Sequence, residues 1–132
     1  MDLETHLRRK LEEMSALIFS RDMSIVDLFW SGGRFWLYGS EAHEVDETRE
    51  DLIRHMNGLF AKPYRIRFRF ARLSADRLGE VAWVNAPATL VIVHADRTVE
   101  LPYRLFAVFQ NIEGAWHWRV FSGSEPAAPP SG

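Results

Sequence analysis

The chain has 132 residues and contains no cysteine. The absence of cysteine excludes a disulfide framework, a thiolate nucleophile and any zinc site with cysteine ligands. Of the 16 basic residues only Lys10 and Lys62 are lysine, and the formal net charge is −2 with a pI of about 6.2. This balance gives no overall attraction to nucleic acid or to an anionic membrane, so neither is expected as a partner.

Long apolar runs are also missing. No stretch approaches the roughly 18 consecutive apolar residues that a membrane-spanning helix needs. The first residues, Met1 to Glu4, are acidic and lack the basic and apolar segments that mark a signal peptide, so a cytoplasmic protein is expected. Metal-binding spacings such as H-x-H and H-E-x-x-H are absent, so neither a metal nor another cofactor is expected.

What the chain does contain is typical of a globular domain. Hydrophobic residues make up 47% of it and charged residues 26%. Its length fits a single domain of about 100–200 residues, which we place at residues 1–124. The tail at 125–132 is rich in proline and small residues and is expected to be disordered.

Three segments have the pattern of helices. Residues 2–20 carry apolar side chains three and four positions apart, which is typical of an amphipathic helix. A second, short helix follows, with Asp22 or Ser24 as its N-terminal cap. Thr48 followed by Asp51 resembles a capping box and predicts the start of a third helix.

The second half of the chain alternates with a period of two, which predicts strands. The strands are expected at 34–39, 64–70, 80–94, 98–111 and 115–122. Asp76 to Gly79 is expected to be a turn between two of them. Helices at one end of the chain must then cover a long sheet. The expected fold is α+β and cone-shaped, with three N-terminal helices packed on a strongly curved mixed or antiparallel sheet.

Four segments, taken in their order and spacing, carry a family resemblance. They are Gly39 to Leu52, Gly79-Glu80-Val81-Ala82-Trp83-Val84, Tyr103-Arg104-Leu105-Phe106-Ala107-Val108-Phe109, and the ending from Glu113-Gly114-Ala115-Trp116 to Ser124. With them the chain resembles the NTF2-like superfamily and, within it, the SnoaL-like and ketosteroid-isomerase-like branch. Phe106 stands where threonine is usual and Ser122 where histidine is usual. The resemblance implies an apolar pocket between the helices and the concave sheet.

Steroid isomerases of this superfamily act through a general-base carboxylate, an oxyanion-binding tyrosine and a carboxylic acid. The resemblance places these three groups near Leu37, Met14 and Leu105, respectively. All three positions are apolar here, so the isomerase mechanism is not carried over to this chain.

Asp27, His55 and Arg104 are the candidate catalytic residues, although nothing in their spacing demands a catalytic set. Asp27 is either an acid or base at the mouth of the pocket or a solvated partner of an arginine. His55 is either a proton shuttle or a half-exposed side chain at the edge of a helix face. Arg104 either binds a substrate carboxylate or pairs with a structural acid such as Asp27 or Glu100.

Six further residues are expected to line the pocket: Trp30, Tyr38, Trp83, Asn85, Trp118 and Ser122. Strand alternation puts Trp116, Trp118 and Ser122 on one face of the last strand. Aromatic side chains also build cores, so a structural role for them stays open. The arginines at alternate positions from 65 to 69 are expected to form a solvated face or salt bridges rather than a phosphate site.

The later strands are apolar on both faces, with Leu90 and Ile92 on one side and Val91 and Val93 on the other. One face covers the core. The other needs a cover of its own, because monomers rarely expose large apolar patches. We therefore expect a homodimer through the convex face of the sheet, and the family resemblance agrees.

Three functions stay open. The first is a SnoaL-like protein whose apolar cavity binds a small hydrophobic molecule. The second is a cofactor-independent isomerase, lyase or hydrolase acting on a small carbonyl or polyketide-like substrate, and the third is a non-catalytic interaction module. A carboxylate or histidine that points into the cavity, within about 3 Å of a second polar group, distinguishes the enzyme from the binding protein. A fully packed cone indicates the interaction module.

Overall fold

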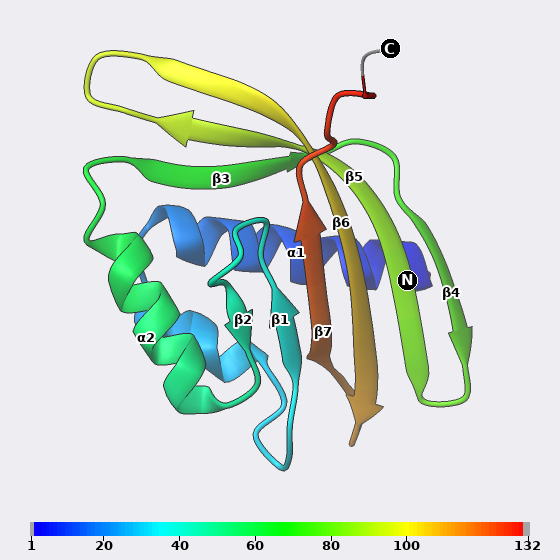
Figure 1. Cartoon of the computed structure of the whole chain (residues 1–132). Coiled ribbons are helices and arrows are strands. Elements are labelled where there is room, and N and C mark those ends of the chain that lie inside the picture. Colours follow the sequence, from blue (N-terminus) through cyan, green and yellow to red (C-terminus); the bar gives the residue numbers. More distant parts are fainter. Residues whose placement is uncertain (1, 131–132) are drawn as a thin grey trace.

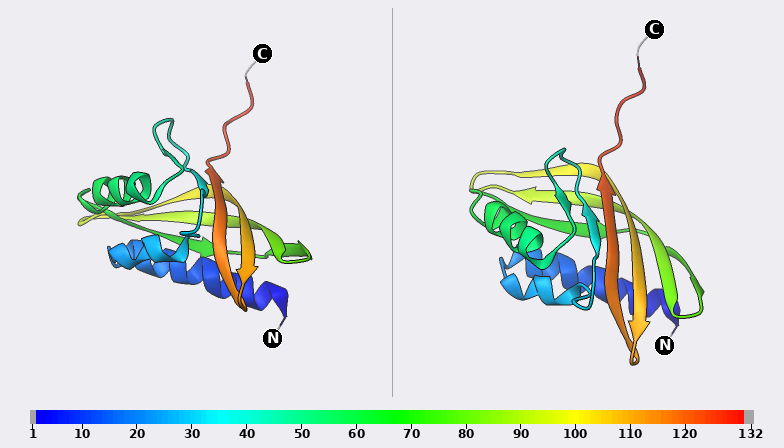
Figure 2. Two further views of the ribbon diagram at one scale, coloured as in Figure 1. Left: turned by 90° about the horizontal axis from the view of Figure 1, so that it is seen from below. Right: turned by 60° about the horizontal axis from the view of Figure 1, so that its bottom comes forward.

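The computed structural model describes residues 2–130, which form an α+β fold (Figure 1). Its elements are α1 (Leu3–Phe19), the 3-10 helix η1 (Met23–Leu28), β1 (Trp36–Tyr38), β2 (Val45–Asp46), α2 (Arg49–Phe60), β3 (Arg65–Phe70), β4 (Ser74–Leu78), β5 (Val81–Val93), β6 (Thr98–Ile112) and β7 (Ala115–Ser124). Residues 125–130 lead away from the body without a helix or strand (Figure 2), and 131–132 of the expected tail lie outside the described residues. No helix within the described range is long and apolar enough to cross a membrane.

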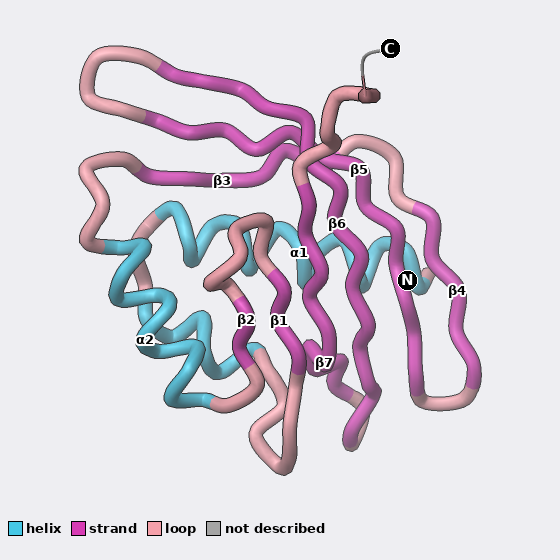
Figure 3. Tube along the Cα trace, viewed as in Figure 1, coloured by secondary structure: helices cyan, strands magenta, loops and turns pink. Residues whose placement is uncertain are grey.

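All of the strands named above belong to one curved, mixed sheet. Its order is β2-β1-β7-β6-β5-β3, and β4 also pairs with β5. β1 runs parallel to β7, whereas the other pairs are antiparallel. The long strands β5 and β6 bend near their middle, so that the sheet curls over the helices (Figures 1 and 3). The predicted α+β architecture with helices on a strongly curved sheet is confirmed.

Helix α1 lies against this sheet along its length (Figure 2). Its buried apolar residues are Leu7, Leu11, Met14 and Ile18, which have the predicted spacing. Ser15 joins the helix to the edge strand β3. Its Oγ accepts a hydrogen bond from the Phe68 N–H at 2.7 Å and donates one to the Phe68 carbonyl at 3.2 Å. One side chain thus satisfies two backbone groups that an edge strand would otherwise leave open.

Two strands differ from the prediction. The segment from Asp76 to Gly79 was expected to be a turn, but most of it belongs to β4, and the turn itself is limited to Gly79 and Glu80. Gly79 has a φ of 58°, a left-handed conformation that favours glycine. The second strand, β2, lies inside the segment from Glu41 to Glu47, whose acidic sequence predicts only a loop. It has two residues, which is too short for an alternating pattern to be visible in the sequence.

A β-bulge in β7 interrupts the side-chain alternation that was predicted for this strand. Val108 of β6 lies opposite Val120, but the next residue, Phe109, lies opposite Trp118. One extra residue reverses the alternation of the strand. Trp118 therefore faces the core, whereas Ser122 faces the other side, and the prediction that they share one face was wrong.

Replacement of Ser15 by alanine tests the contact between α1 and β3. Ser15→Ala leaves the buried N–H and carbonyl of Phe68 without their partner, and we expect a loss of about 1–3 kcal/mol in the free energy of unfolding. Urea denaturation measures this change. The control is Ser124→Ala at the exposed end of β7, and equal stability of the two variants would contradict the assigned role.

Candidate functional site

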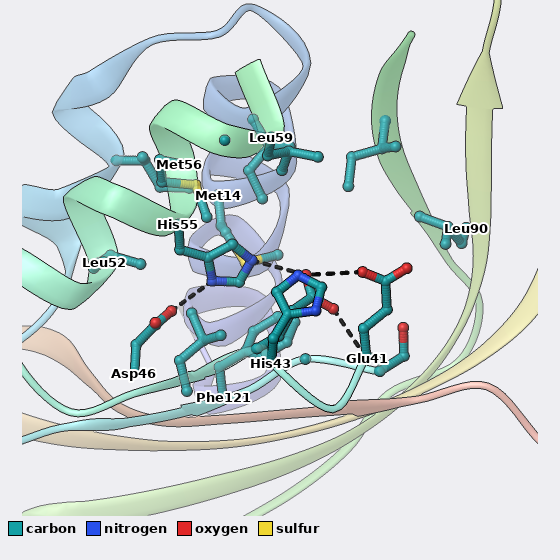
Figure 4. A pocket seen from close by; sticks show the side chains of 18 of the residues that line it. Met14, Glu41, His43, Asp46, Leu52, His55, Met56, Leu59, Leu90 and Phe121 are labelled. Atoms are coloured by element: carbon teal, nitrogen blue, oxygen red, sulfur yellow. Dashed lines mark hydrogen bonds and ion pairs between the residues drawn. The ribbon is translucent and has the colours of Figure 1, made fainter. Parts of the chain in front are cut away.

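A cavity of about 470 Å³ lies between α1, α2, the β1–β2 hairpin and the inner face of the sheet (Figure 4). This volume falls within the range of small-molecule sites. Its apolar lining comes from the helices and the sheet and includes Met14, Phe29, Leu52, Phe68, Leu90 and Phe121. Most of its polar lining comes from the hairpin and from α2, and includes Glu41, His43, Glu44, Asp46 and His55. The cavity is therefore apolar in most of its wall and polar beside the hairpin.

The local sequence brings Asp46 and His55 together. Asp46 ends β2, and α2 begins three residues later. The predicted capping box is present: Thr48 Oγ1 accepts a hydrogen bond from the Asp51 N–H at 3.1 Å, and the Asp51 carboxylate accepts one from the Thr48 N–H at 3.2 Å. The capping box fixes where the helix starts, so that His55, on its second turn, faces the strand that precedes it.

His55 lies between two carboxylates (Figure 4). Its Nδ1 is 2.5 Å from Oδ2 of Asp46, and its Nε2 is 2.8 Å from Oε2 of Glu44. The side chains of Asp46, His55 and Glu44 are 7%, 13% and 19% exposed, so burial decreases from Asp46 to Glu44. We call these three residues the acid–histidine chain. It runs from the buried Asp46 of β2, through His55 of α2, to Glu44, which directly precedes β2 in the hairpin.

The charges of this chain follow from its contacts. Burial alone would lower the pKa of His55, but the hydrogen bonds and charges of Asp46 and Glu44 outweigh it and raise the pKa to about 9. Burial would likewise raise the pKa of Glu44, but hydrogen bonds from His55 and the Glu41 N–H hold it below its usual value. At neutral pH His55 is therefore an imidazolium, and Glu44 is ionised.

Tyr103 on β6 is a further polar group of the cavity wall. It is 5% exposed. Burial and the negative charges of Glu44 and Glu125 raise the pKa of its hydroxyl well above the usual value, so the hydroxyl stays protonated. Gly123 makes room for it, because a Cβ at this position would lie 1.9 Å from Tyr103 Oη.

Only one of the three candidate catalytic residues lines the cavity. His55 does so, and with a side chain that is 13% exposed and in contact with two carboxylates it is more buried than the alternative of a half-exposed side chain expected. Asp27 is exposed on η1, and its carboxylate pairs with Nη2 of Arg49 at 2.8 Å. It is therefore a solvated partner of an arginine, the second of the two alternatives for this residue. Arg104 is exposed on the convex face of the sheet, away from the cavity.

The six predicted lining residues lie elsewhere. Tyr38, Trp83, Asn85 and Ser122 belong to the convex face, where Asn85 and Ser122 are register partners of the exposed Phe106. This differs from the prediction because these strands are apolar on both faces, so alternation alone does not say which face turns inward.

The two remaining tryptophans pack within the protein. The Trp30 ring lies 5.9 Å from the ring of His117. Trp118 is fully buried, and its ring centroid is 4.5 Å from that of Phe109. Trp118 thus has a structural role in the core, which was the alternative to its predicted place in the cavity lining.

Three functional candidates are absent from the sequence-based prediction: Glu44, Asp46 and Tyr103. The first two belong to the acidic segment from Glu41 to Glu47. The sequence contains a signal for these two acids, because their segment directly precedes a capped helix that carries a histidine. Within residues 2–130, no group of three or more histidine, aspartate and glutamate side chains is arranged to hold a metal ion.

Solved structures of the same fold share little sequence with the chain. A proposed dehydratase of the NTF2-like family from Streptomyces avermitilis has a TM-score of 0.81 at 13% identity, covering 94% of this chain and 96% of that one. A protein from Catenulispora acidiphila in complex with S-DNPA has a TM-score of 0.81 at 12% identity, covering 93% and 92%. An NTF2-like protein of unknown function from Pseudomonas putida KT2440 has a TM-score of 0.75 at 14% identity, covering 96% and 89%. These similarities show that the chain has an NTF2-like fold.

The sequence itself matches the model of the SnoaL-like domain over residues 8–128. The chain therefore belongs to the SnoaL-like family, and the resemblance drawn from its four segments is confirmed. No curated protein matches the chain.

The pH dependence of stability tests the charge of His55. Because folding raises its pKa from 6.5 to about 9, the stabilisation from its ion pairs is fully present below about pH 6.5 and is lost as the pH rises through about 9. We expect the free energy of unfolding to fall by on the order of 2 kcal/mol over this window. Urea denaturation at a series of pH values measures it.

The matched variants are His55→Gln and His6→Gln, the second at an exposed position of α1. The decrease in the free energy of unfolding with rising pH should become smaller in His55→Gln and should persist in His6→Gln. A fall of the same size in both variants would show that other groups cause it.

Proposed function

We propose that the protein binds a small, mainly apolar molecule in its cavity and that the acid–histidine chain supplies a proton-transfer group at the polar side. One observation carries this proposal. A histidine lies in the cavity wall within hydrogen-bond distance of two carboxylates, at 2.5 and 2.8 Å. This arrangement supports an enzyme over a passive binding protein.

The remaining features of the cavity support the same function. Its wall is mostly apolar, and Tyr103 adds a neutral hydroxyl that stays protonated. The ionised Glu44 lies beside the cavity and accepts a proton, and the imidazolium of His55 holds its carboxylate in place. Isomerases, lyases and hydrolases that work without a cofactor need such groups.

The comparisons are consistent with this proposal without specifying a reaction. One protein of the same fold is a proposed dehydratase, and another was solved with the small molecule S-DNPA. The alternative of a non-catalytic interaction module expects a fully packed cone. A cavity of about 470 Å³ favours the small-molecule function instead.

A substitution that fills the cavity tests ligand binding. Leu59 lines the cavity from α2, whereas Asn57 on the same helix is exposed. With the neutral apolar dye N-phenyl-1-naphthylamine as the probe, we expect Leu59→Trp to weaken binding by at least about tenfold, which corresponds to about 1.4 kcal/mol. Dye fluorescence measures the affinity.

The control is Asn57→Trp, which adds the same side chain outside the cavity and should bind like the unmodified protein. Equal binding by both variants would place the dye elsewhere. Mass spectrometry of small molecules that copurify with the protein identifies the natural ligand, and Leu59→Trp should lose that ligand as well.

We also propose that the protein is a homodimer through the convex face of the sheet. Strand register aligns Trp83, Val108, Val120 and Trp36 in one row across four strands, and Phe106 and Tyr38 belong to the next row. Phe106 and Tyr38 are each 43% exposed. A second copy of the same apolar face would cover these side chains in a symmetric interface.

Phe106→Asp tests the dimer. A charge in the middle of the interface should convert the protein to a monomer, because an unpaired buried charge opposes association. Light scattering after size-exclusion chromatography measures the molar mass. Leu78→Asp is the control, since Leu78 is 78% exposed at the sheet edge and should leave the mass unchanged. A monomeric unmodified protein would refute the proposal.

A further inference from the structure

The hydrogen bonds of His55 leave it no free donor for a ligand. Its Nδ1 is engaged by Asp46 and its Nε2 by Glu44. An imidazolium has only these two N–H groups. A molecule that enters the cavity therefore does not meet an available N–H of His55 unless it first displaces one of the carboxylates.

Glu44 is the least buried member of the acid–histidine chain. Its Oε2 accepts from His55 at 2.8 Å, and its Oε1 accepts from the Glu41 N–H at 2.9 Å. A carboxylate offers about four acceptor positions, so roughly half of the capacity of Glu44 remains unused. Glu44 lines the cavity and is more exposed than either other member of the chain. The polar group that the chain presents to a ligand is thus an acceptor.

The surrounding charges reinforce this preference. Five carboxylates line the cavity, but Glu41 and Glu125 are exposed and Asp51 pairs with Arg54 at 3.3 Å. The buried side therefore holds the carboxylates of Glu44 and Asp46 against the single imidazolium of His55, and the other cations, Arg54 and Lys62, are exposed. His43 pairs with Glu41 at 3.5 Å. The positive charges of Arg54 and Lys62 are exposed and screened by water, so they compensate the negative charge on the buried side of the cavity poorly.

Tyr103 adds no positive charge to the cavity wall. Its hydroxyl is buried in the wall and neutral, so it contributes a dipole rather than a positive charge. Arg104, which was expected to hold a substrate carboxylate, lies on the convex face instead. Among the described residues that line the cavity, His55 is the only buried cation, and Asp46 and Glu44 already occupy it. No further buried cation is present there to balance an anionic ligand.

From these contacts we infer that Glu44, rather than His55, is the residue that meets the ligand, and that it selects an apolar molecule ending in a protonated amine over one ending in a carboxylate. Asp46 and His55 are then positioning residues that hold the Glu44 carboxylate in place. A neutral hydroxyl is intermediate, since it donates a hydrogen bond to Glu44 but brings no charge. The inference rests on the proposed binding function of the cavity.

Three probes with the same ring test this selectivity: 2-naphthylmethylamine, 2-naphthalenemethanol and 2-naphthoate. Each competes at neutral pH against N-phenyl-1-naphthylamine bound to the unmodified protein. We expect the amine to bind at least about tenfold more tightly than the alcohol, and the carboxylate to bind most weakly. The comparison needs no variant, so it stands even if a substitution at Glu44 prevents folding.

Glu44→Gln then assigns the preference to one residue. Glutamine keeps the shape and an acceptor for His55 but removes the charge, so the amine should lose more affinity than the alcohol and should no longer bind more tightly than the alcohol. The control is Glu47→Gln in the same segment, because Glu47 pairs with Arg34 and does not line the cavity among the described residues. The amine preference should persist in this control.

The outcomes separate the two proposals. If the alcohol binds but the amine binds no more tightly in the unmodified protein, the inference fails and the proposed function stands. If the amine preference survives Glu44→Gln, the assignment to Glu44 is wrong. If none of the three probes displaces the dye, the proposed cavity function fails, and the inference fails with it.

Discussion

The hydrogen bond between the imidazolium of His55 and the carboxylate of Asp46 joins α2 to the β1–β2 hairpin, which together form the polar side of the cavity. Asp46 is only 5% exposed, and a carboxylate at that depth requires a partner. His55 provides one at 2.5 Å and also holds Glu44 of the hairpin at 2.8 Å. Helix α2 and the β1–β2 hairpin thereby become one wall. Removal of His55 would leave two carboxylates facing each other across this wall.

The sheet divides the protein into two surfaces with different roles. Its inner face packs against α1 and lines the cavity with side chains such as Phe68 and Tyr103. Its convex face carries Phe106 and its neighbours, which are apolar but exposed. Both surfaces arise from the same strands, because alternate residues of β5 and β6 face opposite sides. The cavity and the proposed dimer contact are therefore separate, and substitutions in one need not disturb the other.

The sequence predicts most of the fold and part of the site. The spacing of Leu7, Leu11 and Met14 predicts α1, the pair Thr48 and Asp51 predicts the start of α2, and the family resemblance predicts the curved sheet. The two helix signals are local, so they are visible without knowledge of the tertiary structure. The placement of the pocket residues depends instead on which strand face turns inward and on the bulge beside Val120. Neither is encoded in a local pattern, and the role of Asp46 depends on a strand of only two residues.

The protonation state of His55 tests the central claim most directly. Nuclear magnetic resonance of the nitrogen-labelled protein observes the two ring nitrogens separately. The account predicts that both carry a proton at neutral pH and that the ring titrates near pH 9, because Asp46 and Glu44 stabilise the imidazolium. A neutral ring at pH 7 that titrates near its ordinary value of 6.5 would show that the two carboxylates do not hold it, and would contradict the account.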